Sequence, residues 1–240
     1  MKTINKTRLF PWTTLLVGLI GFALRCWLYS DVEEKLLPAH HPAETICFIL
    51  LAVMIAAIWL GVQNVSARAA YGELFPKSVT AAVGIFIAAV GLGVSAFTAE
   101  GVGLLRYVVP GVGVLAVVVL VLTGLLRLKG WKPAWMLYGV VAVYLILRTM
   151  ASCSAWSSQT QLQAYFFQLL GSCFLLLAAY YRVALCARGG RPTLYVFFAQ
   201  AALFCCCLSC VGGDWLFYLS SGIWMAADYC TLPLGGRYAK

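Results

Sequence analysis

Four ionisable side chains interrupt the long apolar stretches of this sequence: Arg25, Arg148, Arg182 and Asp228. Inserting such a group into the membrane within a helix costs roughly 2.5–3.5 kcal/mol. We therefore expect each of the four to have a structural or functional role. Arg25 and Arg148 fall near one end of their segments, and two recessed arginines can hold a carboxylate or a phosphate through paired hydrogen bonds. Alternatively, each pairs with an acidic residue such as Glu44 or Asp214 and only joins helix ends.

Arg182 and Asp228 fall at matching depth near the opposite ends of their segments. The hypothesis for these two residues is a buried ion pair, or a shared water-filled cavity. The alternative is that Arg182 extends its charged end to the membrane surface and that Asp228 has no particular role.

One apolar segment carries a polar stripe at helical spacing. Its members are Gln161, Tyr165, Gln168, Ser172, Ala179 and Arg182. Polar groups in a lipid-embedded helix must face protein or water, and later segments offer partners in Gln200, Tyr218, Ser220 and Ser221. The stripe therefore predicts either a substrate pathway or interhelical hydrogen bonds, which contribute about 0.6 kcal/mol each. The candidate pathway residues are Arg25, Arg148, Tyr165, Gln168, Ser172, Gln200, Tyr218 and Ser221.

Metal, cofactor and catalytic motifs are weak or absent in the sequence. His40 and His41 lie near acidic residues, but Pro42 and Glu44 suit a helix start better than a metal site. Nearly all ten cysteines fall in apolar stretches, which favours small packing residues over a redox or zinc site. We find no phosphate-binding loop and no hydrolase or zinc-protease motif. The expectation is no metal, no cofactor and no catalysis, with an enzyme acting on lipid as the alternative.

The elements that must position these residues are membrane-spanning helices. The chain has 240 residues, of which 63% are hydrophobic and 10% charged, against about 45–50% and about 25% in soluble domains. Apolar runs of about twenty residues predict helices and not barrel strands. The sequence thus predicts an all-α polytopic bundle forming one transmembrane domain. Its eight expected spans are 9–30, 43–64, 78–98, 104–126, 134–150, 162–186, 193–211 and 215–232.

The charges between these spans separate by sign. One alternating set of connections and ends carries twelve basic residues against Glu73: Lys2, Lys6, Arg8, Arg68, Lys77, Arg127, Lys129, Lys132, Arg188, Arg191, Arg237 and Lys240. The other set carries six acidic residues against Lys35: Asp31, Glu33, Glu34, Glu44, Glu100 and Asp214. Basic residues collect on the cytoplasmic side, which predicts a plasma-membrane protein with both termini in the cytoplasm. Basic charge dispersed over short connections touches lipid headgroups and argues against nucleic-acid binding.

A sparse internal similarity suggests a four-plus-four repeat of the same orientation, as in some transporters. Leu24-Arg25 closes the first span and Leu147-Arg148 closes the fifth. The inner connections after the second and sixth spans contain Pro76 and Pro192. Chance similarity remains an equal alternative.

Several short stretches resemble those of small, uncharacterised bacterial multi-spanning membrane proteins. They are Leu28-Tyr29-Ser30, Leu36-Leu37-Pro38, His41-Pro42 and Ala178-Ala179-Tyr180-Tyr181-Arg182. The resemblance is loose over most of the chain, and it implies a multi-spanning bundle without a particular activity.

Two functions remain open from the sequence. The first is a small-solute transporter, or the membrane-embedded binding component of one, which the polar stripe and the recessed arginines favour. The second is a non-transporting membrane subunit or sensor that works through partner proteins, which the short connections favour. The expected partners are the lipid bilayer and, in either case, a further membrane or ATPase subunit.

Overall fold

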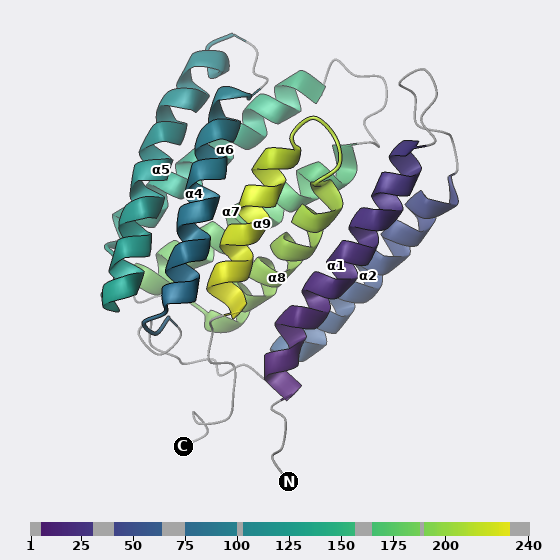
Figure 1. Ribbon diagram of the computed structural model, residues 1–240, viewed down its shortest axis with the longest axis horizontal. Helices are drawn as coiled ribbons and strands as arrows, with labels where there is room; N and C mark the ends of the chain where they lie inside the picture. The colour runs from purple at the N-terminus through teal and green to yellow at the C-terminus, as the bar shows by residue number, and fades with distance from the viewer. Residues whose placement is uncertain are drawn as a thin grey trace.

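The computed structural model describes residues 6–30, 41–63, 75–99, 103–156, 165–187 and 190–230, and within these ranges it consists of helices without strands. The helices are α1 (Lys6–Ser30), α2 (Pro42–Val62), α4 (Val79–Phe97), α5 (Leu105–Lys129), α6 (Trp135–Trp156), α7 (Phe166–Ala187), α8 (Pro192–Ser209) and α9 (Trp215–Cys230). They run up and down through one elongated bundle (Figure 1). The all-helical prediction is confirmed.

Local sequence signals set several helix ends. The His41 ring nitrogen Nδ1 accepts a hydrogen bond from the Ala43 N–H at 3.2 Å, and Pro42 follows as the first helical residue of α2. Ser78 caps α4 in the same way, its hydroxyl accepting from the Ala81 N–H at 3.2 Å. At the end of α5, Gly130 adopts φ 73°, a left-handed conformation that costs glycine little.

Seven of the described helices, α1 to α8, are long and apolar enough to cross a membrane. The eighth, α9, has 16 residues, a length of about 24 Å at 1.5 Å per residue, against a hydrocarbon core of about 30 Å. The described part of α9 reaches Cys230, and the predicted end at residue 232 lies outside the described residues.

The other boundaries agree with the predicted spans to within a few residues, with two extensions. The helix α5 continues past Leu126 to Lys129, and α6 continues past Met150 to Trp156. Pro110 lies inside α5, and the helix continues through it to Lys129. The predicted residues 64 and 162–164 fall outside the described ranges.

The helix α8 is the centre of the bundle. Within the segment long enough to span, 72% of its residues are buried, against 28–44% in the other spanning helices. It packs against α7, α9, α1 and α2, while α4 packs against α9 and α5, and α6 lies between α5 and α7. The exposed leucines, isoleucines and valines of the outer helices form a surface suited to lipid.

Small residues allow α4 and α9 to approach each other closely. A Cβ at Gly84 would overlap the Ala227 Cβ, and one at Gly91 would overlap the Ser220 Oγ. Glycine at these positions lets two backbones meet, as lipid-embedded helix pairs often do.

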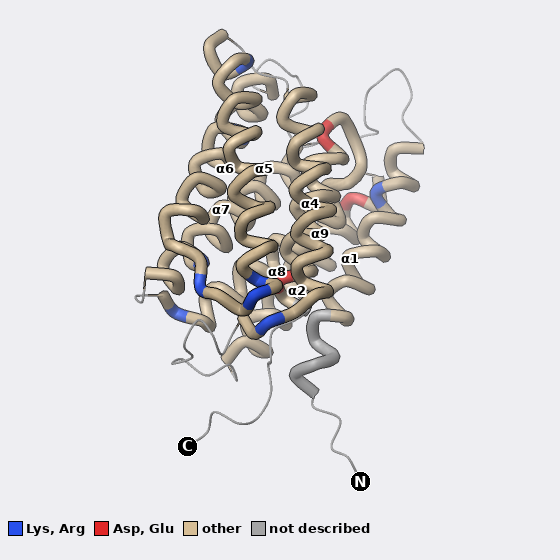
Figure 2. The backbone as a smooth tube through the Cα atoms, turned by 60° about the vertical axis from the view of Figure 1, so that its left-hand side comes forward, with Lys and Arg blue, Asp and Glu red and all other residues tan. Residues whose placement is uncertain are grey.

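The beginning of α1 and the end of α9 lie at the same end of the bundle (Figure 1). Most of the described Lys and Arg residues gather at that end, whereas acidic residues occur mainly toward the other (Figure 2). Arg106, in the first turn of α5, is an exposed basic residue at the acidic end that the sequence count did not include.

The two halves of the chain pack differently. In the second half α7 packs along α8, whereas the corresponding helices of the first half, α2 and α4, form no comparable pair. The helix α2 instead packs on α1 and on α8. The structure therefore gives the proposed four-plus-four repeat no support.

Candidate functional site

Arg182 and Asp228 form an ion pair between α7 and α9, with both side chains completely buried. Two tyrosine hydroxyls accept further hydrogen bonds from the Arg182 guanidinium group, Tyr195 at 3.1 Å and Tyr138 at 2.7 Å. The centre of the guanidinium group also lies 4.4 Å from the Tyr138 ring centroid and 4.5 Å from that of Phe75. Aromatic faces and hydroxyls thus replace water around this buried charge.

A second buried arginine shares the Phe75 ring. The Arg127 guanidinium carbon lies 5.0 Å from the centroid of that ring, and the residue is 4% exposed. Arg127 was predicted to lie in a connection, but it belongs to the last turn of α5, where positive charge suits the helix dipole. The inner end of the bundle therefore holds two arginines around the Phe75 ring, with contributions from five helices and from the segment that precedes α4.

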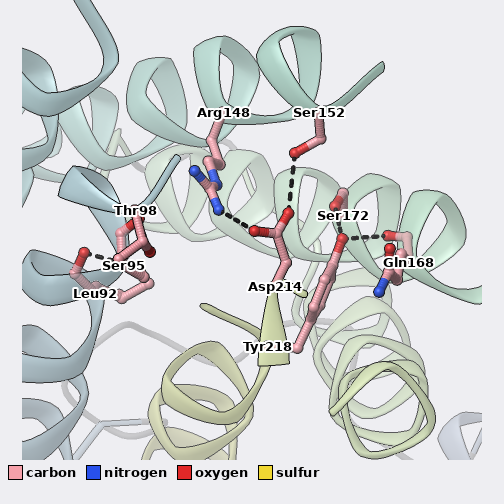
Figure 3. A network of polar contacts seen from close by, with 9 residues as sticks. All are labelled: Leu92, Ser95, Thr98, Arg148, Ser152, Gln168, Ser172, Asp214 and Tyr218. Carbon is pink, nitrogen blue, oxygen red and sulfur yellow. Dashed lines mark hydrogen bonds and ion pairs between the residues drawn. The ribbon is translucent and has the colours of Figure 1, made fainter. Parts of the chain in front are cut away.

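The other end holds a second arginine–aspartate pair. An Arg148 N–H (Nη2) donates to Asp214 Oδ1 at 2.6 Å, and the Ser152 hydroxyl donates to Oδ2 at 3.4 Å (Figure 3). Arg148 is 1% exposed, whereas the Asp214 side chain is 18% exposed. Asp214 directly precedes α9, so its carboxylate also lies at the positive end of that helix dipole.

Arg25 has surroundings different from those of Arg148. It is fully buried, and its guanidinium carbon lies 5.1 Å from the ring centroids of both Tyr29 and Phe167. One Arg25 N–H donates to the Tyr29 hydroxyl at 3.5 Å. Arg148 instead faces Asp214 and the Phe217 ring, so the two arginines have separate sets of contacts.

The polar stripe of α7 meets α9 at its outer half. The Ser172 and Tyr218 hydroxyls lie 3.1 Å apart, and Tyr218 donates to the Gln168 backbone carbonyl at 3.0 Å (Figure 3). Tyr165 lies apart from this contact, since its ring stacks on Trp156 at 5.0 Å. Gln161 lies outside the described residues.

The helix α8 joins α9 nearer the inner end. The Gln200 side-chain N–H donates to the Tyr229 hydroxyl, and both residues are buried. Ser221 is buried on α9 between these contacts. Ser220 belongs to another face, where its hydroxyl donates to the Leu216 carbonyl at 2.7 Å beside α4.

These contacts define one structure, which we call the polar seam: Gln168, Ser172, Gln200, Tyr218, Ser221 and Tyr229, between the two arginine–aspartate pairs. Asp214, Tyr218, Ser221 and Asp228 recur along α9 at intervals that keep them near one face. The two aspartates are fourteen positions apart in the sequence, which is about 21 Å of helix. The seam therefore connects the two ends of the bundle.

Several buried polar atoms along the seam make no hydrogen bond to the described residues. They are Gln200 Oε1, Ser209 Oγ, Ser221 Oγ and Trp224 Nε1. A buried polar group without a partner costs about 1–3 kcal/mol. Natural proteins keep such groups where water, a ligand or chemistry uses them.

The sequence did not identify several residues of these clusters. Tyr138, Tyr195 and Phe75 surround Arg182, and Tyr229 pairs with Gln200. Each tyrosine is 1% exposed or less within an apolar helix. These tyrosines could have been identified from the sequence, because a tyrosine hydroxyl in the middle of an apolar segment needs a hydrogen-bond partner.

The fold and the buried charges define an integral membrane protein that contacts the lipid bilayer through several helices. No protein-family model, no curated protein and no solved structure matches the chain. Among the described residues, no group of three or more His, Cys, Asp or Glu side chains is placed to hold a metal ion.

Proposed function

We propose that this protein transports a small polar solute across the membrane along the polar seam. The observation that carries this proposal is the line of buried polar side chains between Arg148–Asp214 and Arg182–Asp228. Interhelical hydrogen bonding alone does not require polar atoms that have no partner, such as Ser221 Oγ and Gln200 Oε1. A solute that moves along the seam, or the water that accompanies it, would form hydrogen bonds with these atoms one after another.

The proposed orientation places both termini in the cytoplasm of a bacterial-type plasma membrane. Arg127 and Lys129 lie in the last turn of α5, Lys132 follows that helix and Lys77 precedes α4. These helix ends lie at the end of the bundle where α1 begins (Figure 1), and basic residues favour the cytoplasmic face. In this orientation Arg148 and Asp214 receive solute from outside, and Arg182 and Asp228 lie toward the cytoplasm. The proposed function contains no catalytic step.

Uptake by purified protein in liposomes tests this proposal. The probes are radiolabelled glycine, acetate, methylamine and glycerol, which cover zwitterionic, anionic, cationic and neutral solutes. We expect uptake of at least one probe above that of protein-free liposomes. Ser221→Leu should abolish it, because a larger apolar side chain would replace a buried polar group in the middle of the seam.

A matched control lies outside the seam. Thr123 in α5 is 2% exposed and donates to the Leu120 carbonyl at 2.8 Å. Thr123→Val should retain uptake. Absence of uptake for all four probes by folded protein would overturn the proposal and favour a subunit or sensor role. Undiminished uptake by Ser221→Leu would also overturn it, since the seam would then not be the path.

A further inference from the structure

The outer ion pair has unused hydrogen-bonding capacity. Two Arg148 nitrogens, Nε and Nη1, are buried and have no hydrogen-bond partner among the described residues. The same is true of the Tyr144 hydroxyl, one helical turn earlier on α6. Arg148 and Tyr144 are each 1% exposed. Three donor groups therefore converge where bulk water does not reach.

The position of the Tyr144 ring is fixed by its neighbours. A Cβ built on Gly113 of α5 would lie 3.1 Å from a ring carbon, so the tyrosine packs directly on that helix. The Ser95 side chain lies close to the Tyr144 hydroxyl, and Arg148 and Asp214 are near enough to act on that hydroxyl electrostatically. Ser95 and Thr98 lie on the opposite side of Arg148 from Asp214 in the view of Figure 3. Helices α4, α5, α6 and α9 thus surround one small polar site.

Asp214 gives this site an acceptor and an opening. Its Oδ1 is held by Arg148 at 2.6 Å, but Oδ2 has only the Ser152 hydroxyl at 3.4 Å. The carboxylate is partly exposed, and a Cβ at the neighbouring Gly213 would meet nothing within 4 Å. A ligand approaching from this end would therefore meet Oδ2 of Asp214 before Arg148.

The charge of the pair selects the class of ligand. Arg148 and Asp214 together carry no net charge, so a simple anion or a simple cation would add an unbalanced charge to a buried site. A zwitterion adds none: its carboxylate accepts from the spare Arg148 N–H groups and Tyr144, and its ammonium group donates to Asp214 Oδ2. We propose that this outer site binds a small zwitterion of the α-amino acid class.

This inference rests on the proposed function, because it names the solute class that enters the seam. It is nevertheless tested by binding, which does not require transport. The probe is tritiated glycine bound to the purified full-length protein in detergent, with unlabelled L-alanine, acetate, methylamine and acetamide as competitors. We expect L-alanine to displace glycine at least tenfold more effectively than acetate, methylamine or acetamide.

Two variants assign binding to this site. Tyr144→Phe removes one donor and should weaken glycine binding roughly three- to tenfold, the usual effect of one hydrogen bond. Gly213→Trp should block the approach to Asp214 without altering Arg148 or Tyr144. The matched control is Tyr107→Phe, at an α5 residue that is 76% exposed, and it should bind as the unaltered protein does.

The outcomes separate this inference from the transport proposal. No glycine binding, displacement by acetate or methylamine as effective as by L-alanine, or full binding in Tyr144→Phe would each overturn the zwitterion site. Uptake of another probe through a Ser221-dependent path would leave transport standing in those cases. Glycine binding that is weakened in Tyr144→Phe and lost in Gly213→Trp would support the site even if liposomes took up no probe.

Discussion

Arg182 is a single residue whose charge organises the inner end of the bundle. Its guanidinium group pairs with Asp228, donates to two tyrosine hydroxyls and lies over the Phe75 and Tyr138 rings. These contacts replace hydration that the group loses completely on burial. They also tie α6, α7, α8 and α9 to one point.

Removing the carboxylate of this pair should destabilise the protein strongly. Breaking a buried ion pair by deleting one partner costs about 3–5 kcal/mol, because the other charge stays buried. We expect Asp228→Asn to lower the melting temperature in detergent well below that of Glu44→Gln. Glu44 is a partly exposed acid in the first turn of α2, where losing its charge costs about 0.3–1 kcal/mol.

The reversed pair, Arg182→Asp with Asp228→Arg, separates pairing from packing. If the two charges interact directly, the double variant should recover part of the melting temperature lost in either single variant. Equal melting temperatures for Asp228→Asn and Glu44→Gln would contradict a stabilising role for the pair.

At the scale of elements, the packing of α4 on α9 supports the polar face of α9, although α4 itself carries no charged residue. Gly84 and Gly91 of α4 face Ala227 and Ser220 of α9 at distances that exclude any added side-chain atom. In lipid this close contact supplies stability that the hydrophobic effect cannot, because lipid chains are as apolar as the helix surfaces. The orientation of the polar face of α9 therefore depends on two glycines of the neighbouring helix α4.

A side chain at Gly84 should separate these helices. Gly84→Val places a Cβ onto that of Ala227, and overpacking of this kind costs about 1–3 kcal/mol. The control, Gly139→Ala in α6, meets nothing within 4 Å and should be neutral or stabilising, since alanine favours helix more than glycine does. Thermal unfolding in detergent measures both variants.

Moving the methyl group between helices provides a stricter check. Gly84→Ala should destabilise, and Ala227→Gly in the same chain should restore much of the loss, because the combined volume is then unchanged. Additive destabilisation in the double variant would show that the two residues do not pack on each other.

At the scale of the whole molecule, the two ends of the bundle differ in charge (Figure 2), and the polar seam runs between them. The α5–α6 connection and the start of α1 lie at one end, and the α8–α9 connection lies at the other (Figure 1). Reporter fusions test which end faces the cytoplasm. A green fluorescent protein fused after Lys132 should fluoresce and alkaline phosphatase there should be inactive, because basic connections stay inside.

Fusions after Gly213 serve as the opposite control. There, alkaline phosphatase should be active and the fluorescent protein dark. The reversed pattern at both sites would place the acidic end in the cytoplasm and would invert the direction proposed for solute entry. The same pattern at both sites would contradict the helix arrangement itself.

Sequence alone determined the class of fold and the approximate positions of the helices. A chain with 10% charged residues can be folded stably only in lipid, and apolar runs of membrane length then have to be helical. The alternation of charge also predicted the side on which each connection lies. These features are local, since each depends on the composition of one segment.

Tertiary structure decided which polar groups meet. Arg182 could have reached the membrane surface as the sequence alternative held, but the rotation of α7 places it against Asp228 instead. The same rotation brings Ser172 to Tyr218, whereas the Tyr165 ring stacks on Trp156. The spacing of residues along a helix determines which of them share one face. It does not determine which helix packs against that face, because this depends on how all the helices pack together.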